Sequence, residues 1–148
     1  MNEVLDVGHI IQLAVAPVFL LAGIGALLNV VTHRLARVID RARVLEERLA
    51  DQPDPNNMSR IKHELGALDR RMLYAQRAIW LFSTAALLIC VVVATLFIGE
   101  FIAANVEALV AMMFITTMLA MIVGLILFLM EISVATRTLR VRAALLAK

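Results

Sequence analysis

Glu131 is the residue whose type and place most strongly suggest chemistry. It follows the apolar stretch 108–130 and shares a helical stripe with Gly124. Ionisable groups at membrane depth are costly and often functional, and a small residue lets another helix approach closely. Glu131 is therefore either a proton or cation site inside an oligomer or half of an ion pair with an arginine such as Arg34 or Arg77. Its place near the headgroups, where a carboxylate is less costly, favours the ion pair.

A pore lining is the second chemistry that the residues suggest. The candidate residues follow one stripe of the first apolar stretch and its continuation: Gln12, Phe19, Gly23, Asn29, His33 and Arg37. In a ring of copies, polar side chains and an apolar constriction such as Phe19 would suit a pore. The alternative, which we regard as the simpler, is helix packing. In that case Gly23 and Gly25 permit close crossings, and Asn29 makes one interhelical hydrogen bond.

Charges at the two ends of the apolar stretches point in opposite directions. Four acidic residues would form an outer rim that attracts cations: Glu3, Asp6, Glu100 and Glu107. They also have a plainer explanation, since Lys and Arg are excluded from outer loops. Arginines after the first stretch, among them Arg34 and Arg48, would attract anions or acidic headgroups. The ion selectivity of a pore is therefore open.

Composition places these residues in a membrane protein. Of 148 residues, 62% are hydrophobic and 18% are charged, and the mean hydropathy is +0.90. Soluble domains average about 45–50% apolar and about 25% charged residues. The only cysteine, Cys90, excludes an intrachain disulfide, and a net charge of +2 is too small to suggest a nucleic-acid partner.

Three stretches are long enough to cross a bilayer as helices, which requires about 20 apolar residues. They cover residues 10–31, 78–98 and 108–130. All fourteen Lys and Arg residues lie in 32–77 and 132–148. Because basic flanks stay in the cytoplasm, we expect the amino terminus outside and the long loop and carboxy terminus inside.

The segment between the first two spans reads as a helical hairpin, 32–77. Apolar residues recur at alternating spacings of three and four from Leu35 to Leu49 and again from Ile61 to Ile79, as in coiled coils. Prolines and asparagines in 51–57 break the hairpin, and Ser59 is a candidate N-cap. With a tail helix over 132–148, the predicted fold is an all-α membrane protein of one domain, 1–148. Its three long helices span the bilayer and extend into the cytoplasm as an antiparallel coiled-coil-like bundle.

Catalytic and cofactor motifs are not found in the sequence. There is no HExxH, phosphate-binding glycine loop or nucleophile elbow, and the three histidines lack neighbours at metal-ligand spacing. We therefore expect neither an enzyme nor a bound cofactor or metal.

The arginine-rich exit of the first span carries a family resemblance. The run Arg34-Leu-Ala-Arg-Val-Ile-Asp-Arg-Ala-Arg43, with Pro17, Asn29, Glu131-Ile-Ser-Val-Ala and Arg140, resembles small bacterial inner-membrane proteins grouped as a domain of unknown function. The resemblance covers most of the chain. It implies a bacterial origin and three spans, and it implies no activity, substrate or site residue.

Two functions fit these features. The first is a homo-oligomeric ion channel or pore in the inner membrane, lined by the first span. The second is a non-catalytic scaffold or regulatory subunit whose cytoplasmic bundle binds a partner or anionic lipid. Membrane lipid and further copies of the chain are the expected partners, with a small ion added in the pore interpretation.

Overall fold

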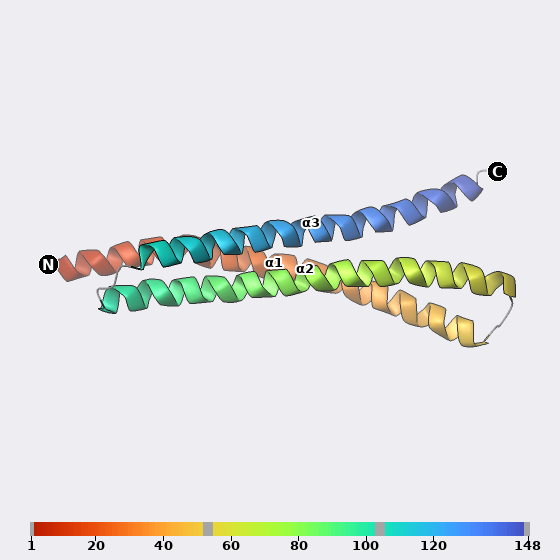
Figure 1. Cartoon of the computed structure of the whole chain (residues 1–148), viewed down its shortest axis with the longest axis horizontal. Helices are drawn as coiled ribbons and strands as arrows, with labels where there is room; N and C mark the ends of the chain where they lie inside the picture. The colour runs from red at the N-terminus through yellow and green to blue at the C-terminus, as the bar shows by residue number, and fades with distance from the viewer. Residues whose placement is uncertain (1, 52–54, 103–105, 147–148) are drawn as a thin grey trace. The chain divides into compact units, whose positions relative to one another are not determined.

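Three long helices make up the chain. The computed structural model describes residues 2–51, 55–102 and 106–146, and side chains within 12–51, 58–99 and 106–135. Figure 1 traces α1 (Asn2–Asp51), α2 (Pro55–Ile102) and α3 (Glu107–Leu146), of 50, 48 and 40 residues. The described ranges contain no strand. The predicted all-helical class, with three long apolar helices, is confirmed.

The start of α2 differs from the prediction. The helix begins at Pro55, so Ser59 lies inside the first turns and is not the N-cap. The backbone N–H groups in the first turn of a helix have no acceptor within the helix. Proline has no N–H group, so it suits a helix start.

Each helix contains a segment long and apolar enough to cross a membrane. The candidate spans lie in Ala14–Asp51, Met58–Gly99 and Glu107–Ala135. The chain is therefore a multi-pass membrane protein.

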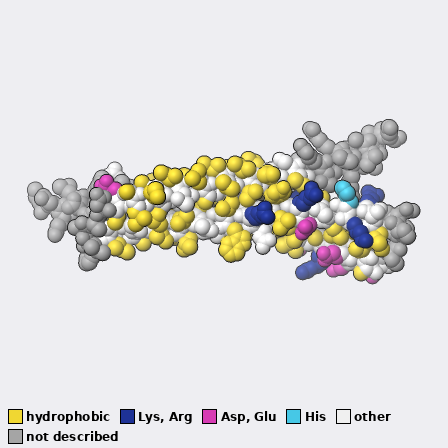
Figure 2. Space-filling view, in the orientation of Figure 1, with side chains coloured by type: hydrophobic (Ala, Val, Ile, Leu, Met, Phe, Trp, Pro, Cys, Tyr) yellow, Lys and Arg dark blue, Asp and Glu magenta, His cyan; other side chains and the backbone are white. Residues whose placement is uncertain are grey.

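The chain divides into two compact units. The apolar unit comprises residues 1–29 and 80–123, and the charged unit comprises 30–79 and 124–148. All fourteen Lys and Arg residues belong to the charged unit. In the space-filling view, hydrophobic side chains make up most of the described surface of the apolar unit that faces the viewer (Figure 2).

A heptad repeat runs along α1. Its least exposed positions alternate between spacings of three and four residues: Ala14, Pro17, Leu21, Ile24, Leu28, Val31, Leu35, Val38, Ala42, Leu45 and Leu49. Such a repeat keeps one seam of a helix against its neighbours and gives a left-handed supercoil. The seam predicted for 35–49 is therefore the second part of a longer one.

Helix α2 carries two such seams side by side, as expected of a helix with neighbours on two flanks. One seam contains Leu68, Ala75, Phe82 and Ile89, and the other contains Glu64, Arg71, Ala78, Ala85, Val92 and Gly99. On α3 the buried positions recur every seven residues, at Thr117, Gly124 and Glu131.

The two units have different cores. In the apolar unit the fully buried side chains include Ile24, Phe82, Ile89 and Thr117. In the charged unit Val38, Leu45 and Leu68 form a cluster, and further residues of the predicted hairpin seams pack against it: Ala42, Ile61, Leu65 and Met72.

Candidate functional site

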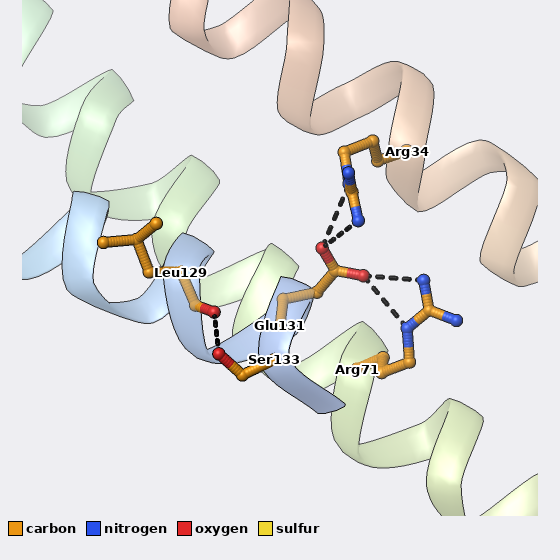
Figure 3. Close-up of polar contacts among 5 residues, drawn as sticks. All are labelled: Arg34, Arg71, Leu129, Glu131 and Ser133. Atoms are coloured by element: carbon orange, nitrogen blue, oxygen red, sulfur yellow. Dashed lines mark hydrogen bonds and ion pairs between the residues drawn. The ribbon is translucent and has the colours of Figure 1, made fainter. Parts of the chain in front are cut away.

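A buried carboxylate between two guanidinium groups is the main polar feature of the charged unit. Glu131 on α3 is 1% exposed. Arg34 on α1 donates from Nε to Oε2 at 3.1 Å, and its Nη2 forms an ion pair with the same oxygen at 3.1 Å. Arg71 on α2 donates from Nε at 3.0 Å and Nη2 at 2.8 Å to Oε1. Figure 3 shows each carboxylate oxygen held by one guanidinium, so this Arg34–Glu131–Arg71 cluster joins all three helices.

The heptad repeat explains why these residues meet. Arg34 immediately precedes the core position Leu35, so it borders the packed seam of α1. Arg71 belongs to the second seam of α2, seven residues before Ala78. Glu131 occupies the buried series of α3. The long side chains of Arg34 and Arg71 thus reach the shorter, buried side chain of Glu131.

The cluster is built to hold the helices together. Hydrogen bonds between an ionised guanidinium and a carboxylate are about twice as strong as those between neutral groups. Arg34 also lies over the ring of Phe128, 5.6 Å from its centroid, a favourable cation–π distance. Because each carboxylate oxygen is already held by one guanidinium, the ligands that a cation would need are occupied by the two arginines.

Arg34 is one of the two arginines that the sequence suggested as an ion-pair partner for Glu131. The second partner is one that the sequence analysis did not name. Arg77 is exposed, and Arg71 makes the contact. The missed signal is the second seam of α2. Arg71 lies at seven-residue spacing from Ala78 and Ala85, whereas Arg77 falls between the seams.

A second ion pair lies one heptad away. Arg41 follows Arg34 by seven residues, and Glu64 precedes Arg71 by seven. Arg41 donates from Nη2 to Glu64 Oε1 at 2.8 Å, with side chains 42% and 23% exposed. The charged unit therefore contains arginine–glutamate ion pairs at two levels of burial.

The candidate pore-lining residues all lie on exposed positions of α1. These are Gln12, Phe19, Gly23, Asn29, His33 and Arg37, and the Phe19 side chain is 75% exposed. They fall between the core positions of the heptad, on the side of α1 that its core seam leaves exposed.

Of the predicted outer acidic rim, the structure describes one side chain. Glu107 is exposed at the start of α3. The side chains of Glu3, Asp6 and Glu100 lie outside the described part of the chain. In that part, no three His, Cys, Asp or Glu side chains gather where a metal could bind.

Hydroxyl side chains in the apolar segments bond to their own helices. Thr84, Thr95, Thr116 and Thr117 each donate to the carbonyl oxygen four residues earlier, at 2.8–2.9 Å. Such bonds satisfy hydroxyl groups where water is scarce. These threonines therefore add no polar site to the spans.

These features define the class: a small multi-pass membrane protein of three heptad-packed helices joined by a buried arginine–glutamate–arginine cluster. Residues 14–141 match the family described as protein of unknown function (DUF2721). The chain belongs to this family, as its resemblance suggested. Among curated proteins and among solved structures, nothing matches the chain.

Proposed function

We propose that this chain assembles with copies of itself through α1 and forms a non-catalytic ion pore in the bacterial inner membrane. The observation that carries the proposal is the exposed side of α1. All six candidate pore residues are exposed and lie away from the core seam.

A second stripe on α1 supports the self-association. Exposed and mostly small or polar residues recur at spacings of four and three: Val18, Ala22, Gly25, Asn29, Thr32 and Ala36. A Cβ added at Gly23 or Gly25 would meet nothing within 4 Å, so the small residues serve no close crossing within the chain. Small residues at this spacing are typical of helix–helix contacts in membranes, where packing drives association.

A pore requires several copies. Three spans are too few to enclose a conduit within one copy and also shield it from lipid. In a ring, the exposed side of α1 would face the axis and supply polar groups and the ring of Phe19. In this proposal the Arg34–Glu131–Arg71 cluster braces each copy and does not conduct.

The proposed orientation places the charged unit in the cytoplasm and the amino terminus outside. It is supported by the positive-inside rule, since every Lys and Arg lies in the charged unit. Fusing alkaline phosphatase or a fluorescent protein to the carboxy terminus tests it. Fluorescence without phosphatase activity is expected, and the reverse result would overturn the orientation.

Native mass spectrometry of nanodisc-embedded protein tests the assembly. We expect four or more copies in the wild-type particle, and fewer in Gly25→Leu, which adds bulk to the small-residue stripe. Ala111→Leu is the matched control, because Ala111 is an exposed small residue on α3 of the same unit. A monomer or dimer in the wild type would overturn the pore.

Cysteine accessibility tests the lining. In a Cys90→Ser background, we expect Phe19→Cys and Gly23→Cys to react with a membrane-impermeant thiol reagent and to lower ion flux into liposomes. Leu119→Cys and Ile122→Cys on α3, also exposed in one copy, face lipid in this proposal and should stay unreactive. Equal reactivity at the two sets would contradict a lining on α1.

A scaffold remains the second candidate, and exposed apolar residues on the charged unit favour it. Ile39, Val44 and Leu73 are each at least 40% exposed there. If the particle contains one or two copies and liposomes show no flux, these residues are the first to substitute in a search for a protein partner.

A further inference from the structure

A groove opens on the charged unit between α2 and α3. Its lining residues are Tyr74 from α2 and Met130, Ser133 and Val134 from α3, and its volume is about 170 Å³. An engineered cavity of about 150 Å³ binds benzene, so this space admits a small organic group and not a whole lipid. The groove therefore suits the headgroup end of a larger molecule.

Two arginines on α2 lie about one helical turn from the lining residue Tyr74. Arg70 and Arg77 are four residues before and three residues after Tyr74, positions that share a helix face with it, and both are exposed. Ser133 donates its hydroxyl hydrogen to the Leu129 carbonyl oxygen at 2.9 Å. Tyr74 is therefore the lining residue whose hydroxyl can donate to a ligand. Guanidinium groups and a phenol hydroxyl are good donors to phosphate oxygens.

The local charge is positive. In the segments that contain the lining residues, 69–79 and 124–135, three arginines accompany two carboxylates. One of those carboxylates, Glu131, is already shared by Arg34 and Arg71. An anion in the groove would therefore meet a surface with basic groups in excess.

Aromatic residues place the groove at the level of the lipid headgroups. Tyr74 and Trp80 are the only Tyr and Trp of the chain, and they lie six residues apart on α2, about 9 Å along the helix. Trp80 is 69% exposed. Tyr and Trp concentrate where the hydrocarbon core gives way to headgroups, and Trp80 begins the apolar part of α2.

From these observations we infer that the groove binds the headgroup phosphate of an anionic phospholipid. Arg70 and Arg77 contact the phosphate, Tyr74 donates a hydrogen bond to it, and Met130 and Val134 contact the glycerol end of the acyl chains. The inference is independent of the proposed pore, because each copy carries the whole groove.

Lipid retention in native mass spectrometry tests the site. The protein is reconstituted in nanodiscs of phosphatidylglycerol and phosphatidylcholine, and bound phosphatidylglycerol is counted per chain. The double variant Arg70→Gln/Arg77→Gln should lower retention about tenfold or more, because each substitution removes a charge-assisted hydrogen bond to the phosphate. Tyr74→Phe, which keeps the ring and the fold, should lower it by a smaller factor.

The control is Arg43→Gln/Arg48→Gln, which removes the same charge from exposed positions of α1. Arg48 is 14 residues beyond Arg34, about 20 Å along the helix. We expect less than a twofold loss there. An equal loss in both double variants would show general attraction to a basic surface and would overturn the site. Unchanged retention both in Tyr74→Phe and in Arg70→Gln/Arg77→Gln would also overturn the site.

Competition separates a lipid site from a simple anion site. Excess inorganic phosphate or glycerol phosphate should leave phosphatidylglycerol bound, because neither supplies acyl chains for Met130 and Val134. Displacement by either at millimolar concentration would replace the lipid assignment with a free-phosphate site. Counting lipid per chain keeps the result separate from the number of copies and from any flux measurement.

Discussion

In the apolar unit, the buried heptad positions carry Ala, Ile, Val, Phe, Pro, Gly and one Thr. In the charged unit, they carry Leu, Val, Ala, Gly and Glu131. Among the described side chains, ion pairs occur only in the charged unit. Its hairpin adds a Leu-rich cluster around Leu45 and Leu68. The same repeat thus brings helices together with different contacts in the two units.

The difference reflects the solvent in which each unit must be stable. In lipid, exposed Leu or Ile costs nothing, so helices associate through packing of small residues. In water, burial of apolar side chains drives association at about 25 cal/mol per Å². If the charged unit lies in water, its core should be sensitive to lost apolar area, and its buried carboxylate should be sensitive to lost charge.

The largest effect is expected at Glu131. Glu131→Gln leaves Arg34 and Arg71 facing each other across a neutral amide, and breaking a buried pair in this way costs about 3–5 kcal/mol. Because Arg34 is 36% exposed, we expect the lower end of that range. The measurement is the free energy of unfolding in an SDS titration. Asp69→Asn, which removes an exposed carboxylate of the same unit, should change it little, and equal losses would contradict a structural role for Glu131.

The next largest effect tests the solvent argument directly. Leu45→Ala removes a buried side chain in the charged unit and should cost about 2–4 kcal/mol, from lost hydrophobic transfer together with a cavity. Ile89→Ala removes a buried side chain in the apolar unit and should cost less, because lipid replaces water as its reference. Thermal unfolding of both variants in nanodiscs compares them. An equal or larger loss for Ile89→Ala would place the two cores in the same kind of environment.

The sequence was sufficient for the features set by periodicity. Apolar length predicted the three helices, and 3–4 spacing predicted the cluster of Val38, Leu45 and Leu68. Periodicity also placed Glu131 on a stripe with Gly124, a series that the structure shows to be buried. Each of these depends on residues close together in one helix, where geometry is fixed by the backbone.

Features that depend on how helices face each other were beyond the sequence. Knowing that Arg71 and not Arg77 pairs with Glu131 requires knowing that α2 packs on two flanks. A search for one apolar stripe along α2 does not show the second seam. Likewise, packing and pore lining gave the same pattern on α1. Only the exposure of Gly23 and Gly25 shows that their small size is not used within one copy.

A smaller effect is expected where α2 meets the turn to α3. A Cβ on Gly99 would collide with the side chain of Val106, a stiff β-branched residue. Gly99→Ala should therefore destabilise the apolar unit by about 1–3 kcal/mol, as overpacking does. The double variant Gly99→Ala/Val106→Ala should regain most of the loss, measured by thermal unfolding in nanodiscs. Failure of the second substitution to rescue would mean that the backbone, and not Val106, requires glycine.

The smallest effect is expected at the Arg41–Glu64 pair, which repeats the chemistry of Arg71 and Glu131 one heptad away. Its side chains are 42% and 23% exposed, and exposed pairs contribute about 0.2–1 kcal/mol because water screens them. A double-mutant cycle of Arg41→Gln and Glu64→Gln should give a coupling energy in that range, and it should shrink further in high salt. The cycle of Arg71→Gln and Glu131→Gln should give a larger, less salt-sensitive value. The two pairs differ in burial. Similar coupling energies in the two cycles would show that burial does not determine the strength of the pair.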